Sequence, residues 1–300
     1  MRIQMIAVLT AVSIVAPAFA ESTATYRVTF DAEWSSSTHP GSYPGGAHFS
    51  SLIGGVHNDS VRFWELGGIA TPGIEIMAET GSASTLFNEV TSAINAGDAL
   101  EVVTGPGLGA PDSGSTEFDA TTAMPLLTLV TMVAPSPDWF VGIDSLSLRD
   151  GSGWVDSLVV DLYAYDSGTD AGTGFFSGNS DVTPHDPISD FSVTAPFAGT
   201  PRLGTFTLTL LSVVGEPCSA ADVTTQGAGA GDPEFGVPDG AVSAADINFF
   251  VNAWITGDTT VADLTTTGAG IGDPGYGTPD GEVTGADIQF YVNLWILGCP

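Results

Sequence analysis

The last third of the chain contains one sequence pattern twice, in segments 41 residues apart. The matched segments are Asp222–Thr225 with Asp263–Thr266, Gly231–Pro233 with Gly272–Pro274, Pro238–Gly240 with Pro279–Gly281, and Val251–Ile255 with Val292–Ile296. A repeat of this length marks a structural unit that packs on its neighbour. We therefore predict one module at residues 218–300, with repeats at about 218–257 and 259–298.

The spacing within each repeat is typical of a calcium loop. Such a loop has an acid at its fifth position, glycine at the sixth for a sharp turn, and an acid at the twelfth. Phe235 stands where the first ligand is expected, so an insertion interrupts the pattern. The predicted calcium ligands are Asp222, Thr224, Asp239 and Asp246 in the first repeat and Asp263, Thr265, Asp280 and Asp287 in the second.

Each loop is followed by a segment with the apolar spacing of an amphipathic helix. The residues on its apolar face are Ile247, Phe250, Val251 and Trp254 in the first repeat and Ile288, Tyr291, Val292 and Trp295 in the second. No helix is expected before either loop. Each repeat therefore corresponds to half of an EF-hand.

This pair of loops and helices, with its terminal Gly298-Cys299, resembles a GC-type dockerin over about residues 218–300. The resemblance implies calcium binding and attachment to a cohesin-like docking partner. Insertions at Gly227–Val237 and Gly268–Thr278 depart from the dockerin pattern. A chelator is expected to unfold this module.

The two cysteines, Cys218 and Cys299, bracket the repeats. In an oxidising compartment we expect them to form a disulfide. On the chain-entropy account, a bridge closing so long a loop stabilises the module by about 4 kcal/mol. Two free thiols are the alternative.

The amino-terminus has the pattern of a secretory signal peptide at residues 1–20. Arg2 provides the positive charge, residues 6–17 the apolar segment, and Ala18-Phe19-Ala20 the small-residue cleavage site. A retained membrane anchor is the alternative, but the apolar run is too short to span a bilayer. The mature protein is therefore predicted to be secreted, extracellular or cell-surface associated, with no integral membrane segment.

The charge balance limits the possible partners. The chain has 35 Asp and Glu against 5 Lys and Arg, for a formal net charge of -30. Such a surface repels nucleic acid and anionic membranes. The acids reflect calcium sites or a surface adapted to saline surroundings, and composition does not separate these two explanations.

Residues 21–214 read mainly as strands. Apolar residues alternate with polar ones at 26–30, 158–162 and 206–210, and residues 126–133 form a continuous apolar run. Such patterns predict half-buried antiparallel strands around a central strand, and hence a β-sandwich. One helix is expected around Leu86–Ile94, ending at Gly97. Residues 215–217 read as a linker.

Three aspartates of this domain stand at predicted strand ends. Asp138 follows two prolines that restrict the backbone, Asp166 lies in an acid-rich turn, and Asp119 precedes the central run. Carboxylates on loops are the ligands that calcium prefers. From the residues alone, however, many other groups of three acids are equally possible.

The domain resembles the spondin N-terminal domain of the F-spondin and mindin type. The segments that carry the resemblance are Tyr26-x-Val28-x-Phe30, Trp34-Ser35, His48–Gly54, Ala78-Glu79-x-Gly81, Pro135–Gly142, Asp161–Tyr163, Tyr165–Asp170 and Pro201–Leu203. The resemblance implies an antiparallel β-sandwich that acts in adhesion outside cells without catalysis. It also implies one calcium ion held by three acids, which fall on Asp119, Asp138 and Asp166. The weakest match is Asp119, beside which Glu117 is an alternative.

We therefore predict a secreted, calcium-binding adhesion or recognition protein whose partner is a cell-surface or matrix protein or a glycan. Two alternatives remain. A carbohydrate-binding module would use exposed aromatic residues among Trp34, Trp64, Trp139 and Trp154. A glycoside hydrolase attached through its dockerin would need two carboxylates about 5–9.5 Å apart.

Overall fold

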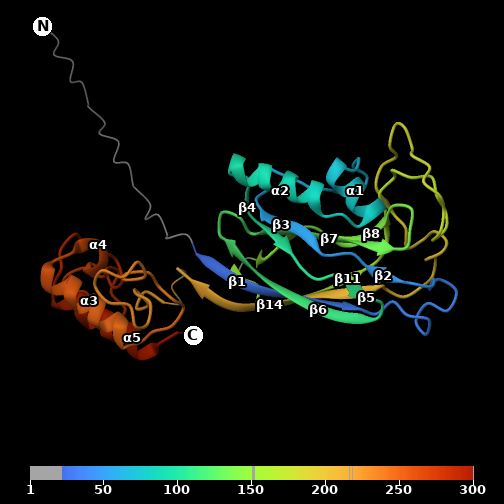
Figure 1. Ribbon diagram of the computed structural model, residues 1–300. Helices are drawn as coiled ribbons and strands as arrows, with labels where there is room; N and C mark the ends of the chain where they lie inside the picture. The colour runs from blue at the N-terminus through green and yellow to red at the C-terminus, as the bar shows by residue number, and fades with distance from the viewer. Residues whose placement is uncertain (1–21, 151–152, 216, 218, 300) are drawn as a thin grey trace, which may run out of the picture.

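The computed structural model describes residues 22–150, 153–215, 217 and 219–299 (Figure 1). The predicted signal peptide at 1–20 and Cys218 lie outside the described residues. Two parts of the chain pack around separate hydrophobic clusters. Strands dominate up to Val214, and helices and loops make up residues 219–299.

The first sheet is antiparallel and has four strands. Its order is β11 (Ser157–Leu162), β14 (Gly204–Val214), β1 (Thr23–Ala32) and β6 (Asp112–Thr121). Every second residue of β1 is buried, because one face of the sheet meets the core and the other meets solvent. The predicted alternation at 26–30, 158–162 and 206–210 is confirmed.

The second sheet has eight strands, and β7 lies at its centre. Its strands are β2 (His48–Phe49), β3 (Ile53–His57), β4 (Ala99–Thr104), β5 (Leu108–Gly109), β7 (Leu126–Ala134), β8 (Trp139–Ser147), β12 (Tyr165–Asp166) and β13 (Ser189–Asp190). β7 pairs with β3 and β8, and is buried along nearly its whole length. The continuous apolar run therefore is the predicted central strand. A separate two-stranded ribbon joins β9 (Arg149–Asp150) and β10 (Gly153–Trp154).

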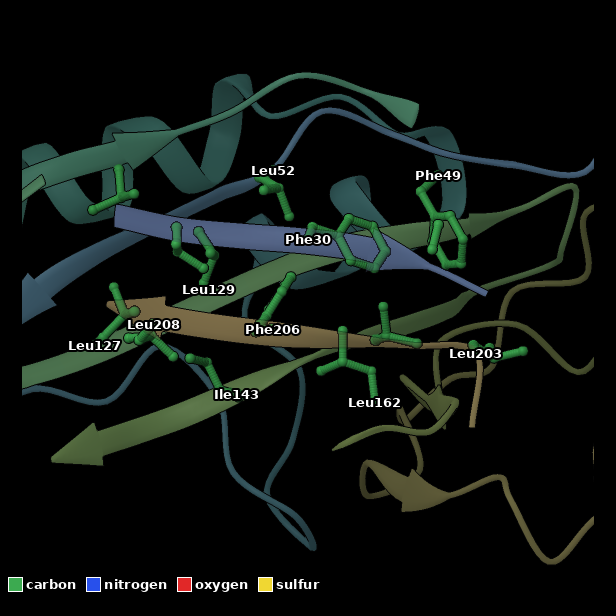
Figure 2. Packing of buried hydrophobic residues seen from close by; sticks show 14 of the residues in the cluster. Phe30, Phe49, Leu52, Leu127, Leu129, Ile143, Leu162, Leu203, Phe206 and Leu208 are labelled. Atoms are coloured by element: carbon green, nitrogen blue, oxygen red, sulfur yellow. The ribbon is translucent and has the colours of Figure 1, made fainter. Parts of the chain in front are cut away.

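The two sheets face each other across an aromatic and aliphatic core (Figure 2). Phe30 meets Phe49 and Phe206 edge to face, with ring centroids 4.9 Å and 5.2 Å apart. Edge-to-face pairs contribute stability beyond the apolar area that they bury. This packing confirms the mainly β, antiparallel architecture.

Two helices cover the outer face of the second sheet (Figure 1). The expected helix is present as α2 (Ser84–Ala96), with Gly97 in the left-handed conformation as its C-cap. The expectation of a single helix is wrong, because α1 (Pro72–Thr80) precedes it. Ile74 and Met77 of α1 pack with Val130 and Phe140 in a second hydrophobic cluster.

Residues 219–299 hold α3 (Ala244–Thr256), α4 (Thr259–Ala262) and α5 (Gly285–Leu297). The helices predicted after each loop are thus present. The expectation that no helix precedes a loop fails for the second repeat, where Asp258 caps the four-residue α4 directly before Asp263. Phe250 and Tyr291, which are equivalent in the two repeats, stack with their ring centroids 3.7 Å apart.

No helix in the described part of the chain is long and apolar enough to cross a membrane.

A buried histidine links three strands of the second sheet. His57 is fully buried, with Nδ1 2.7 Å from the carbonyl oxygen of Asn58 and Nε2 2.8 Å from Thr128 Oγ1. A carbonyl only accepts, so Nδ1 carries the proton and Nε2 accepts from the Thr128 hydroxyl. That hydroxyl oxygen in turn accepts from the Ser145 N–H. Burial, which lowers the pKa of His57, favours this neutral form of the ring.

We expect the native protein to resist protonation of His57. Burial lowers the pKa of His57 and outweighs the Asn58 carbonyl and Asp144, which raise it; Arg62 makes a smaller contribution that also lowers it. A base whose pKa is lower in the native than in the unfolded protein contributes stability at pH values above the unfolded pKa, which is about 6.5 for histidine. This contribution is lost as the pH falls from there through the native pKa. In an NMR titration, the His57 midpoint should be lower in native protein than in urea. Equal midpoints would contradict the neutral assignment.

Candidate functional site

The end of β7 leads into a segment that holds Asp138 rigidly. Asp138 is 0% exposed, and Ser136 Oγ accepts from the Trp139 N–H at 3.1 Å. One carboxylate oxygen, Oδ2, accepts from Ser167 Oγ at 2.9 Å and from the N–H groups of Thr169 and Asp170 at 2.9 and 3.1 Å. This oxygen joins the β7–β8 connection to the loop that follows β12.

The other oxygen of Asp138 is unusual. Oδ1 is buried and has no hydrogen-bond partner among the described residues, and the same is true of Glu79 Oε1. A buried carboxylate oxygen without a partner is costly, and such groups are rare in native proteins. The indole N–H of Trp139 is the third such buried atom among the described residues, so this region contains two acceptors and one donor without protein partners.

Glu79 comes to this region on the last turn of α1. The Gly81 C-cap of that helix lies against Ser50 and Met132, at the end of β7 from which Asp138 follows. Glu79, Ser136, Pro137 and Asp170 line one hollow of about 300 Å³. The sequence identifies Glu79 only as part of the Ala78-Glu79-x-Gly81 segment and does not predict it as a ligand. Its position before a helix-ending glycine was the available signal.

The electrostatics of these acids are mutually unfavourable. Burial raises the pKa of Glu79 against a hydrogen bond from the Thr169 side chain, and repulsion from Glu75, Asp138 and Asp170 adds to the increase. Burial also raises the pKa of Asp138, although three hydrogen-bond donors oppose the shift. Burial and then repulsion from Asp138 raise the pKa of Asp166 to about 6. A nearby cation would relieve the repulsion in every case.

The structure brings Asp138 and Asp166 together but does not bring Asp119 to them. Asp166 pairs with Trp139 in the second sheet, whereas Asp119 lies on β6 of the first sheet, where its Oδ1 accepts from Thr25 Oγ1 at 2.7 Å. Asp119 precedes β7 and Asp138 follows it, so a nine-residue strand separates them. At about 3.3 Å per residue, that strand places them about 30 Å apart. The alternative, Glu117, forms an ion pair with Arg27.

Asp170, unlike Asp119, lies beside Asp138. Its carboxylate accepts from the N–H groups of Gly172 and Ser180 at 2.6 and 2.7 Å, and its own N–H donates to Asp138. Within the described ranges, no three His, Cys, Asp or Glu side chains already form a cluster that could hold a metal. Glu79, Asp138 and Asp170 are close but retain their separate contacts.

The predicted ligands of the repeats are engaged by backbone groups. Asp222 accepts from the N–H groups of Asp239 and Gly240, and Asp239 accepts from those of Gln226 and Ala241. Thr224 Oγ1 accepts from Gly236 N–H. The second repeat has the same contacts for Asp263, from Asp280 and Gly281, and for Thr265, from Gly277.

The twelfth-position acids differ from the rest. Asp246 and Asp287 are 0% exposed, and each accepts four hydrogen bonds. Burial by itself would raise the pKa of Asp287, but donors from Thr284, Leu264 and Thr265 outweigh it and hold the pKa below its usual value. Cys299 lies 3.4 Å from the Gly240 carbonyl oxygen, and its predicted partner Cys218 is outside the described residues.

The tryptophans considered for carbohydrate binding are core residues. Trp34 and Trp139 are 0% exposed, Trp64 is 5% and Trp154 is 9% exposed. Stacking on a sugar needs an open aromatic face, so these four side chains do not form a sugar-binding platform. The described arginines are also engaged: Arg27, Arg62 and Arg202 pair with acids, and Arg149 lies over Trp154. This leaves no basic patch for nucleic acid in the described part of the chain.

Comparison with known proteins agrees with this architecture. The Spondin_N family profile matches residues 24–201. Human Spondin-2 is 35% identical over 185 residues, covering 59% of this chain and 55% of that protein. Bovine Spondin-1 is 36% identical over 175 residues, covering 55% of this chain and 21% of that protein.

The chain thus spans about half of Spondin-2 and about a fifth of Spondin-1. The family match ends before the two repeats begin. It covers the second sheet, α1 and α2, the strands β1, β6 and β11 of the first sheet, and the whole neighbourhood of Asp138, and it ends before β14. The chain therefore belongs to the spondin N-terminal domain family.

Proposed function

We propose that this chain is a secreted, non-catalytic adhesion or recognition protein whose sandwich binds Ca²⁺ beside Asp138 and whose repeat module attaches it to a larger assembly. The observation that supports this most is the pair of buried, unpartnered carboxylate oxygens of Glu79 and Asp138 in a spondin-type sandwich. The proposed partner is a cell-surface or matrix protein or a glycan.

The donor set favours calcium. The side chains around the hollow offer carboxylate, hydroxyl and amide oxygen, with no histidine or cysteine among the lining residues. Hard cations such as Ca²⁺ prefer such oxygen ligands, whereas Zn²⁺ and Cu²⁺ prefer nitrogen and sulfur. Glu79 and Asp138 would hold the ion, and Asp170 and Asp166 add negative charge nearby. A bound ion would fix the loops after β7 and β12 as one surface.

The repeat module is the proposed anchor. Ile255 and Ile296 occupy equivalent positions near the ends of α3 and α5, and are 68% and 70% exposed. Apolar side chains so exposed are suited to a protein partner such as a cohesin-like module. A Cys218–Cys299 disulfide would close this module, as expected for an extracellular protein.

Replacing Asp138 separates its structural role from its cation-binding role. Asp138→Asn keeps an oxygen facing Ser167, Thr169 and Asp170, and removes the buried charge. In chelator, we expect the variant to be more stable than wild type by about 1 kcal/mol or more. Calcium at a hundredfold excess over its Kd should stabilise wild type by about 2.7 kcal/mol and leave the variant unchanged.

Thermal unfolding with calcium and with EDTA measures both effects. Asp186→Asn is the matched control, because Asp186 is an exposed acid of the same loop region. It should retain the response to calcium. A calcium response that survives Asp138→Asn would exclude the proposed site.

Binding of the full chain to the cell-envelope fraction of its source cells tests the adhesive role and assigns it to a module. If the repeats dock, Ile255→Ser with Ile296→Ser should weaken retention roughly tenfold, since buried interface anchors contribute more than 1 kcal/mol each. If the sandwich is the adhesin, Asp138→Asn should weaken it instead. Val159→Ser, at a residue 59% exposed on β11, is the control. Retention unchanged by both variants would contradict the proposal.

A further inference from the structure

We infer that Asp246 and Asp287 are backbone clamps and not calcium ligands, and that the repeat module keeps its fold without calcium. This goes beyond the proposed function and opposes what the spacing of the repeats predicts. Both side chains are fully buried, and the two repeats also hold each other by direct contacts.

The contacts of Asp246 occupy the whole carboxylate. Oδ1 accepts from the N–H groups of Val223 and Thr224 at 2.8 and 2.9 Å. Oδ2 accepts from Ser243 N–H at 2.7 Å and from Ser243 Oγ at 2.9 Å. An ionised carboxylate has about four lone-pair positions, and all are used. Coordination of a cation would break hydrogen bonds that are already made.

The second repeat has the same arrangement. Asp287 Oδ1 accepts from Leu264 and Thr265 at 2.8 and 2.9 Å, and Oδ2 accepts from Thr284 N–H and Oγ1 at 2.7 and 3.0 Å. Two independent copies of one geometry indicate a conserved structural role within this chain. A calcium loop takes a bidentate carboxylate ligand from its twelfth position. In both repeats the carboxylate at that position is already occupied by hydrogen bonds.

Each clamp performs two tasks at once. It completes a capping box at the start of a helix, where Ser243 or Thr284 is the N-cap. It also ties the beginning of its own repeat, more than twenty residues earlier, to that helix. The carboxylate thus closes the inserted loop by accepting from backbone N–H groups. In an EF-hand, a metal ion closes the loop instead, by binding oxygen ligands.

Contacts between the repeats reinforce the clamps without a metal. Trp295 Nε1 donates to the Ser243 carbonyl oxygen at 2.8 Å, and Trp254 Nε1 donates to that of Thr284 at 2.6 Å. Each tryptophan therefore holds the N-cap residue of the other repeat. The Tyr291 hydroxyl donates to the Ala221 carbonyl oxygen at 2.9 Å, across the stacked pair at the centre.

The clamps determine whether docking of the repeat module responds to calcium. A module held in this way presents Ile255 and Ile296 whether or not calcium is present, so its docking would not depend on calcium. Calcium would act only on the sandwich. The chain would then contain one module that responds to the ion and one that does not.

Hydrogen exchange of the full chain, measured by mass spectrometry with calcium and with EDTA, tests the inference. We expect protection of 244–256 and 285–297 to change less than twofold on chelation. Asp246→Asn places an amide N–H₂ against N–H donors, so it should raise exchange in 219–226 and 244–256 at least tenfold, equally with and without calcium. Asp232→Asn, at an exposed acid whose carboxylate accepts from Gly229 N–H, should have no effect.

Loss of protection in 244–256 and 285–297 of the wild type on chelation would overturn the inference, and this outcome does not depend on any variant folding. Normal protection of Asp246→Asn in EDTA would also overturn the clamp role. Segments 134–140 and 166–172 report the sandwich in the same samples. Failure of the proposed sandwich site is therefore distinguishable from failure of the clamp.

Discussion

Buried aspartates that bind distant backbone N–H groups hold the irregular parts of this chain in place. Removing a carboxylate from water is costly unless hydrogen bonds replace the lost solvation. The loop after β12 supplies these hydrogen bonds to Asp138, and the first residues of each repeat supply them to Asp246 and Asp287. The long loops of both modules are ordered by these contacts, because they contain few strands or helices of their own.

The three aspartates differ in one respect that decides their chemistry. Asp246 and Asp287 have donors on both oxygens, whereas Asp138 has one oxygen with three close donors and one with none. The unpartnered oxygen lies in a region that also contains the unpartnered oxygen of Glu79. The same residue type, equally buried, thus uses both of its oxygens in hydrogen bonds in one module and leaves one oxygen without a protein partner in the other.

Much of the fold follows from local sequence patterns. Alternation at period two located β1, β11 and β14, a continuous apolar run located β7, and helical spacing with a terminal glycine located α2. These signals are reliable because each reports a face that must be buried. The loop–helix repeats were also located, because the same pattern appears twice.

The differences between expectation and structure have physical causes, of which some are tertiary contacts. α1 has local end signals that were overlooked, with Thr71 as its N-cap, Pro72 at its start and Gly81 as its C-cap, but its contact with α2 is not local, since Glu89 of α2 accepts from Gly73 N–H at 2.7 Å. Gly73 is needed there because a Cβ would lie 2.8 Å from the Cα of Leu86. Missing α1 also meant missing Glu79. Asp119 was assigned to one calcium site with Asp138 by the family resemblance and by its position at a strand end; in the structure the two flank opposite ends of β7.

The number of calcium ions bound by one full-length chain tests the account most directly, because it depends on the difference between Asp138 and the two clamps. Isothermal titration or equilibrium dialysis of chelator-treated protein gives this number. The account predicts one ion per chain, lost in Asp138→Asn. Three ions per chain, with two retained in that variant, would contradict it.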